Sequence, residues 1–366
     1  MKKIGLVTYY KSYNYGVWLQ AYATLKFLLL NSFDAEIIAY SNPYEESKLK
    51  YSYKEGGRKI GYISSFLKSL LFGKVRYYNK GFLNHLCDYY KLTDIRYSSV
   101  EQMKDLEYDV LIVGSDQVWN PVITNGLDKV FLLDFGRADK RISIASSLGS
   151  KELSESDKNE LIEALKIFDA ISVRENFTKD YLQDSVNKNI QVISDPTFLL
   201  TKENWEKEIA TKSDFFRTKE KYILTYFVSK DKKSKKCIDL VKSYSKKLNL
   251  PVWAVQFSSY YSDAVDKKIL GGSISDFIAL MLNAELIITD SFHGTALSLN
   301  LEKNFIPCQN TENPLRMYNL LKRVNLVSRI NMRCENYKNV NYEDVKKKLY
   351  FLREESIDWI LNAIEN

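Results

Sequence analysis

The residue best suited to chemistry in this sequence is His293, one of only two histidines, which follows an apolar run within Asp-Ser-Phe-His-Gly. An imidazole exchanges protons near neutral pH, so a histidine at the end of a buried strand is suited to general acid catalysis. Gly294 beside it allows a backbone or a ligand to approach closely. The alternative is a histidine that packs or caps the following helix. The second histidine, His85, has no such surroundings.

Two more polar residues follow apolar runs. Arg174 comes directly after the run at 170–173, where a guanidinium could form two parallel bonds with a carboxylate or a phosphate. An ion pair with the adjoining Glu175 is an equally open interpretation. Asp116, within Gly-Ser-Asp-Gln, could accept the proton of a hydroxyl group or could cap a helix.

The elements that must position these residues alternate between strand-like and helix-like segments, which is typical of parallel sheets covered by helices. We predict strands at 4–9, 36–40, 108–113, 141–145, 170–173, 222–228, 252–257 and 285–289, and helices at 17–30 and 345–364. The pattern restarts near residue 222, and 366 residues exceed the usual size of one domain. We therefore predict an α/β fold with two doubly wound, Rossmann-like domains facing a cleft.

The domain boundary is predicted near residue 200. Residues 1–200 form the first domain, with an insertion at about 41–105 that is rich in Tyr and Lys. Residues 201–366 form the second domain and end in an amphipathic helix. In such sheets ligands bind beyond the carboxyl ends of the strands, which is where the three polar residues above lie.

Several classes of function are disfavoured by what the sequence lacks. It has no Gly-x-Gly-x-x-Gly, no Gly-x-x-x-x-Gly-Lys-Ser/Thr and no His-Glu-x-x-His, so we expect neither a metal nor a bound cofactor. The net charge of +7 is dispersed among acidic residues, which argues against a nucleic-acid partner. No apolar run is long enough to cross a bilayer, and no signal peptide is predicted. Four widely spaced cysteines suggest no disulfide framework, and together these features favour a cytoplasmic location.

The motifs at the predicted strand ends together resemble the polysaccharide pyruvyl transferase family. Matching stretches span nearly the whole chain except the insertion, and they are Asn14-Tyr15-Gly16 with 19–23, 109–121, 172–175, 194–197, 289–299, and Arg316 within 314–317. Members of that family are similar to GT-B glycosyltransferases and transfer the enolpyruvyl unit of phosphoenolpyruvate to two hydroxyls of a sugar, forming a ketal. The resemblance implies a GT-B-like fold, phosphoenolpyruvate as co-substrate and a glycan acceptor in surface-polysaccharide assembly. It also implies that residues 1–200 form the acceptor side and residues 201–366 the donor side. A lipid-linked acceptor would bring the enzyme to the inner face of the membrane.

The resemblance also implies roles for individual residues. His293 would protonate the methylene carbon of the donor, and Arg174 would hold its carboxylate or phosphate. Asp116 is the candidate base for the sugar hydroxyl. The remaining donor-binding residues are predicted to be Ser291, Gly294, Thr295 and Arg316. The acceptor-binding residues are predicted to be Asn14, Tyr15, Gln117 and Trp119.

One position departs from the family pattern. Well-studied members carry an arginine two residues before the histidine, and this sequence has Ser291 there. A charged hydrogen-bonding partner contributes about 2–3 kcal/mol to the binding of such an anion. Arg316 is the candidate replacement, and a different donor is the other interpretation. We expect Arg174→Ala to weaken donor binding more than Arg316→Ala.

Two other functions remain open from the sequence. A GT-B glycosyltransferase would use Arg174 and Arg316 to hold the diphosphate of a nucleotide sugar. A non-catalytic glycan-binding relative would explain the loss of the arginine at position 291. The presence of His293, Arg174 and Asp116 together argues against a non-catalytic protein.

Overall fold

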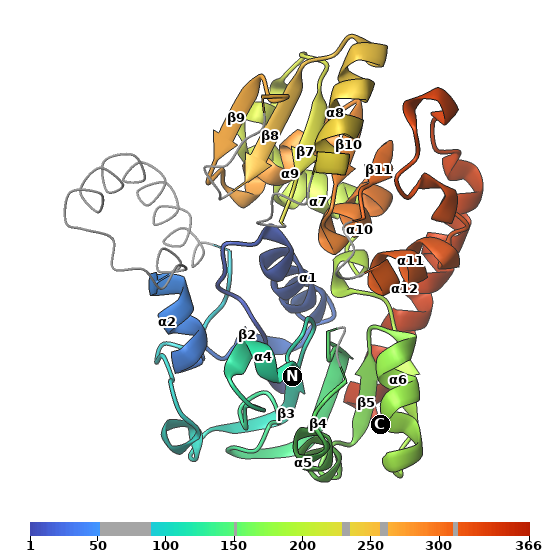
Figure 1. Ribbon diagram of the computed structural model, residues 1–366. Coiled ribbons are helices and arrows are strands. Elements are labelled where there is room, and N and C mark those ends of the chain that lie inside the picture. The colour runs from blue at the N-terminus through green and yellow to red at the C-terminus, as the bar shows by residue number, and fades with distance from the viewer. Residues whose placement is uncertain (52–88, 150–151, 229–234, 257–262, 310–313) are drawn as a thin grey trace, which may run out of the picture.

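A computed structural model describes residues 1–51, 89–149, 152–228, 235–256, 263–309 and 314–366. The predicted helical spacing at Phe66, Leu70 and Leu71 and the second histidine, His85, lie outside these described residues. Two parallel sheets form the framework, one in each half of the chain, and both are flanked by helices (Figure 1).

The first sheet has the strand order β2-β1-β3-β4-β5-β6, and every pair of neighbours is parallel. Its strands are β1 (Lys3–Val7), β2 (Asp34–Ile37), β3 (Glu107–Val113), β4 (Arg137–Ser146), β5 (Ala170–Val173) and β6 (Ile190–Val192). The apolar residues of β1 and β3 are buried on both faces, as expected for a parallel sheet covered by helices.

The second sheet has the order β11-β10-β7-β8-β9, again with parallel neighbours. Its strands are β7 (Ile223–Tyr226), β8 (Val252–Gln256), β9 (Lys267–Leu270), β10 (Leu286–Thr289) and β11 (Phe305–Pro307). The eight strands predicted from the sequence are all present, with ends shifted by a few residues.

Helices connect the strands within each half of the chain. They are α1 (Tyr15–Leu30), α2 (Pro43–Tyr51), α4 (Pro121–Thr124), α5 (Glu155–Leu165), α6 (Asn176–Leu182), α7 (Lys202–Glu208), α8 (Lys235–Leu248), α9 (Ile274–Asn283), α10 (Phe292–Asn300), α11 (Pro314–Arg323) and α12 (Tyr342–Glu365). Among the described helices, α12 is the longest, which agrees with the amphipathic helix predicted at 345–364.

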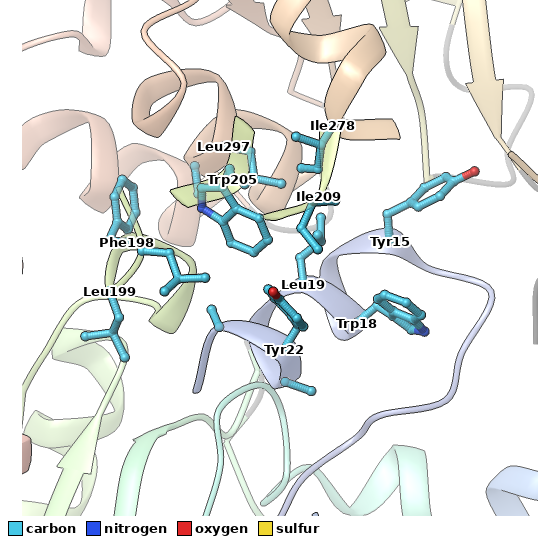
Figure 2. Packing of buried hydrophobic residues seen from close by; sticks show 14 of the residues in the cluster. Tyr15, Trp18, Leu19, Tyr22, Phe198, Leu199, Trp205, Ile209, Ile278 and Leu297 are labelled. Atoms are coloured by element: carbon cyan, nitrogen blue, oxygen red, sulfur yellow. The ribbon is translucent and has the colours of Figure 1, made fainter. Parts of the chain in front are cut away.

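The two halves share one continuous hydrophobic cluster, and α1 lies at its centre (Figure 1). Figure 2 shows Leu19 and Tyr22 of α1 packing toward Trp205 and Leu297 of the second half. The side chains of α1 are almost all buried because they contact both halves, and this helix begins where Asn14 accepts a hydrogen bond from the backbone N–H of Gly16.

Helix α12 returns from the second half to the first sheet (Figure 1). The hydroxyl of Ser356 accepts a hydrogen bond from the backbone N–H of Ser194 at 3.0 Å. Near the end of the helix, the carbonyl oxygen of Ile364 accepts a hydrogen bond from the Lys2 ammonium at 2.7 Å. The C-terminal helix thus ties the last residues to the first half, and the domain boundary near residue 200 stays a prediction.

The cysteines correct one expectation from the sequence. Cys237 on α8 and Cys308 after β11 form a disulfide, with Cα atoms 5.8 Å apart and both residues fully buried. Their separation of 71 residues hides this pair from inspection of cysteine spacing, because only the fold brings the two segments together. Cysteine spacing therefore does not support a reducing compartment, and the cytoplasmic location stays a prediction.

Candidate active site

The candidate site lies at the carboxyl edge of the first sheet, where the residues after β3, β5 and β6 face the start of α10. Asp116 follows β3, Arg174 follows β5, and Asp195 follows β6. His293 is the second residue of α10 in the other half. Parallel strands bring their carboxyl ends to one edge, so residues distant in the sequence meet here.

The guanidinium of Arg174 is enclosed by three carboxylates. Its Nε donates to Glu175 Oε1 at 2.8 Å, its Nη1 donates to Asp195 Oδ2 at 3.0 Å, and its Nη2 lies 3.5 Å from Asp116 Oδ1. The side chain is only 2% exposed. Burial lowers the pKa of Arg174, but the charges of the three carboxylates raise it further, so the pKa is raised overall and the guanidinium stays charged. The ion pair with Glu175 that the sequence left open is therefore present.

His293 and Arg174 contact the same oxygen atom from opposite halves of the chain. The Nε2 atom of His293 lies 3.3 Å from Asp195 Oδ2, which also accepts from Arg174. This contact is electrostatic, because Nε2 makes no well-aligned hydrogen bond with any residue that the structure describes. Burial raises the pKa of Asp195, but the charges of His293 and then Arg174 outweigh burial and hold that pKa well below its usual range. Asp195 therefore remains a carboxylate at neutral pH.

The imidazole of His293 is positioned by the Asn14-Tyr15-Gly16 segment of the first half. A Cβ atom at Gly16 would lie 2.2 Å from His293 Nδ1, so only glycine leaves room for the ring. Asn14 Oδ1 also accepts from the hydroxyl of Tyr226 in the second half at 2.9 Å. The segment predicted to bind the acceptor thus holds the two halves together around His293.

The predicted donor-binding residues of α10 have structural roles. The hydroxyl of Ser291 caps the helix by accepting from the backbone N–H of Gly294 at 3.2 Å. Thr295 donates its hydroxyl to the Ser291 carbonyl oxygen at 3.0 Å, and a Cβ at Gly294 would lie 2.4 Å from Thr289 Oγ1. These residues are buried and do not line the neighbouring cavity, so nothing in this geometry aims them at a donor.

Two predicted acceptor-binding residues are too buried to reach a ligand, which corrects those assignments. Trp119 is fully buried, and its indole N–H donates to the Phe131 carbonyl oxygen at 3.2 Å. Tyr15 is also fully buried, and its hydroxyl donates to the Gly272 carbonyl oxygen at 2.6 Å. Gln117 remains partly exposed and accepts from Asn120 at 2.8 Å. An aromatic side chain that follows a strand can pack in the hydrophobic core or contact a ligand. The sequence alone does not distinguish these two roles.

A cavity of about 280 Å³ lies between the two halves beside this cluster. The loops after β5 and β6 line one side, and Phe292 and one face of α11 line the other. Its charged lining residues are Arg174, Arg316, Lys322 and Arg323 together with the acids Glu175 and Asp195. Basic groups predominate, so the cavity favours a small anion with carboxylate or phosphate groups. His293 does not line the cavity itself but contacts Asp195, which does.

Arg316 differs from Arg174 in its partners. Its guanidinium carbon lies 5.8 Å from the centre of the Phe292 ring, and that of Arg174 lies 4.9 Å from the same ring. The Nε atom of Arg316 is buried without a hydrogen-bond partner among the residues that the structure describes. Burial and then the positive charge of Arg174 lower the pKa of Arg316, so its charge lacks the compensation that Arg174 has. An anion in the cavity would supply it.

Sequence reasoning gave no role to several residues that build this site. Asp195 stood within a matching motif, but its strand β6 has only three residues and was not predicted. Phe292 adjoins His293 and contacts both guanidiniums. The cavity face of α11 repeats at positions 316, 319, 320 and 323, the spacing of one helix face, which would have identified Arg323 beside Arg316.

Comparison with known proteins places the chain in a family. The model of the family described as polysaccharide pyruvyl transferase matches residues 14–312. The chain belongs to the polysaccharide pyruvyl transferase family. The resemblance that the strand-end motifs indicated is thereby confirmed, and at the coarse level of its family the chain is a transferase of polysaccharide modification. No curated protein is significantly similar to this sequence.

Solved structures show that this pyruvyl transferase-family chain has a GT-B-like fold, as predicted. UDP-N-acetylglucosamine 2-epimerase from Rickettsia bellii shares 11% identity at a TM-score of 0.50, covering 100% of this chain and 97% of that one. The enzyme of the same name from Neisseria meningitidis, bound to UDP-GlcNAc, shares 11% identity at a TM-score of 0.50. That match covers 99% of this chain and 100% of the other. At such identities the likeness concerns the fold alone.

The described residues contain no group of three or more histidine, cysteine or acidic side chains arranged to hold a metal ion. In the same part of the chain, no helix combines the length and the apolar character that crossing a bilayer requires.

Proposed function

We propose that this member of the family transfers the enolpyruvyl unit of phosphoenolpyruvate to a sugar of a surface-polysaccharide precursor, forming a pyruvate ketal. One observation carries the proposal. A basic cavity between the halves holds Arg316 without a described counter-ion, beside the His293–Asp195 contact. Phosphoenolpyruvate carries both a carboxylate and a phosphate, the groups that guanidiniums bind best.

Each protein group has a defined part in the proposed reaction. His293 is assigned as the acid that protonates the methylene carbon of the donor, and positive charge develops at the adjacent carbon. Asp195 keeps its negative charge and lies 3.3 Å from the imidazole, so it holds the ring in place beside the cavity. Arg316 holds the donor's anionic groups, while Arg174 fixes the carboxylates around it.

The sugar supplies both nucleophiles. Asp116 accepts the proton of the first hydroxyl as its oxygen attacks the cationic carbon. Phosphate then leaves, and the second hydroxyl closes the ketal ring with loss of its proton. Of the two hydroxyl protons, one replaces the proton taken from His293 and the other leaves with the phosphate. Asp116 lies 3.5 Å from Arg174 and has a left-handed backbone with φ 73°, so the surrounding structure holds it in an uncommon conformation.

Calorimetry on the purified chain tests the choice of donor. We expect phosphoenolpyruvate to give saturable heat and a panel of nucleotide sugars to give none. The opposite result would support the second candidate, a GT-B glycosyltransferase. Lys322 and Arg323 favour that candidate, because they extend the basic lining beyond Arg316 toward a second phosphate. Silence with both classes would favour a non-catalytic glycan-binding protein.

A further inference from the structure

A second, smaller cavity lies on the same edge of the first sheet, and the reaction described above makes no use of it. It has a volume of about 20 Å³ and is lined by residues that follow β1 and β2, by α2 and by Phe131. A space of this size accommodates one water-sized group. The cavity therefore fits a single hydroxyl rather than a whole sugar ring.

An unsatisfied hydroxyl marks this cavity. The phenolic oxygen of Tyr9 is buried and makes no hydrogen bond with any residue that the structure describes. A buried hydroxyl without a partner has lost its hydrogen bonds to water, so such a group is uncommon unless a ligand completes it. The neighbouring Tyr40 differs, because its hydroxyl donates to Asp128 Oδ2 at 2.7 Å. Asn42 donates to the same oxygen at 2.6 Å.

The charge around the cavity is negative on balance. Glu45 and Glu46 line it together with one cation, Lys11, and the carboxylate of Asp128 binds two of its lining residues. Burial, followed by the charges of Glu45, Asp116 and Asp128, raises the pKa of Tyr9. The phenol therefore stays protonated and able to donate, and a carboxylate or phosphate entering this cavity would be repelled.

Aromatic rings complete the walls. The ring of Phe131 lies 4.7 Å from that of Tyr9 and 5.9 Å from that of Tyr40, measured between centroids. Rings of this kind offer apolar faces beside hydrogen-bonding groups, which suits the mixed polar and C–H surface of a sugar.

The strand order connects the two cavities. In the first sheet β1, which leads to Tyr9, is the neighbour of β3, which leads to Asp116. Two strands further along, β5 leads to Arg174 in the basic cavity. At about 4.8 Å between adjacent strands, β3 lies roughly 5 Å from β1 and roughly 10 Å from β5. Asp116, which follows β3, therefore lies between the two cavities.

We propose that the Tyr9 cavity is a subsite for a hydroxyl of a neutral sugar, which lies across Asp116 with its far side held by Tyr9. The assignment rests on the proposed function, in which Asp116 takes the proton of the attacking hydroxyl. It also defines the acceptor class: a neutral hexose unit is accepted at this position and a uronic acid is rejected.

Ligand-observed NMR with the full chain tests the subsite. The probes are the methyl glycosides of glucose, galactose and mannose, each at millimolar concentration, with glucuronate, galacturonate and mannuronate as anionic counterparts. We expect at least one neutral glycoside to bind and its uronate to bind at least tenfold more weakly. Tyr9→Phe should weaken the neutral glycoside about tenfold while phosphoenolpyruvate binding is unchanged. Tyr244→Phe is the matched control, because that hydroxyl donates to the Met332 carbonyl in the other half.

Unchanged glycoside binding in Tyr9→Phe would overturn the assignment, as would equal binding of a uronate or binding of none of the three glycosides. The outcome is separable from that of the proposed function. Glycoside binding that depends on Tyr9 in a protein that ignores phosphoenolpyruvate would contradict the donor and keep the subsite. Phosphoenolpyruvate binding without any glycoside binding would do the reverse.

Discussion

The imidazole of His293 occupies the space that a side chain at position 16 would need, since a Cβ there would lie 2.2 Å from Nδ1. Gly16 belongs to the first half and His293 to the second, so this contact fixes the ring where the halves meet. The hydrogen bond between Asn14 and Tyr226 across the same junction strengthens that placement. Residue 16 therefore determines the position of the proposed acid.

Gly16→Ala is predicted to displace the His293 ring and to abolish ketal formation, with overpacking lowering stability by about 1–3 kcal/mol. The chain has only two histidines, so its imidazole NMR signals are readily assigned with a His293→Gln variant. Gly272→Ala is the matched control, because a Cβ there meets its nearest neighbour at 3.1 Å. An unmoved His293 signal in Gly16→Ala would contradict this account.

Arg316→Ala is predicted to weaken phosphoenolpyruvate binding by about 10- to 100-fold, the range for loss of a charged hydrogen-bonding partner. Stability should change less than in Arg174→Ala, because the buried Nε atom of Arg316 makes no hydrogen bond with a residue that the structure describes. Arg323→Ala should have the smaller effect, since Arg323 already lies 3.4 Å from Glu355. Calorimetry gives both affinities, and equal affinities for Arg316→Ala and the unaltered protein would sink the assignment.

Arg174→Ala is predicted to act mainly on stability. Three carboxylates surround that guanidinium, so its removal leaves buried charges without their partner and costs about 3–5 kcal/mol. We therefore reverse the order of donor effects expected from the sequence and expect Arg316 to be the stronger anchor. Urea unfolding of the two variants measures this, and an Arg174→Ala protein of normal stability but reduced donor affinity would restore the original order.

Acid should destabilise the protein through Asp195. Its pKa lies well below the value of about 3.9 for an unfolded aspartate, so its contribution to stability is complete above that value and is lost as the pH falls through the folded pKa. Asp195→Asn should lower the free energy of unfolding at pH 7 and flatten its decline in acid. Asp263→Asn, at an exposed pair with Lys242, should change the acid profile much less, because water screens that pair. Identical pH profiles for Asp195→Asn and the unaltered protein would refute the role given to this carboxylate.

The Cys237–Cys308 disulfide is predicted to contribute about 2–4 kcal/mol to stability. Alkylation of the denatured protein without reductant should label two fewer cysteines than alkylation after reduction, as measured by intact mass. Labelling of all four cysteines in both samples would show that the bond is absent from the purified protein.

Most strands of the two sheets could be predicted from the sequence. A long apolar run, such as the one that forms β3, indicates both that a buried strand is present and where it lies. Short strands were missed for a physical reason. β6 and β11 have three residues each, and β9 begins with Lys267 and Lys268, so none offers a period to detect. These strands form through pairing with neighbours that only the fold supplies.

Only part of the candidate site could be predicted, because the sequence shows which residues follow strands but not which distant residues they contact. His293, Arg174 and Asp116 were identified by position after strands, and the structure brings them together around Asp195. Three carboxylates surround the Arg174 guanidinium, whereas Arg316 lacks such partners among the described residues, and this difference arises from contacts between distant segments. The sequence therefore could not show which of the two arginines binds the donor more strongly. Burial of Trp119 was hidden in the same way.

The most direct test of the central claim is mass spectrometry of the producer's surface glycan after replacing this protein with its His293→Gln variant. The account predicts that the unaltered protein adds the mass of one pyruvate ketal to the repeating unit and that the variant adds none. A ketal of equal abundance in both glycans, or a glycan that lacks the ketal even with the unaltered protein, would contradict it.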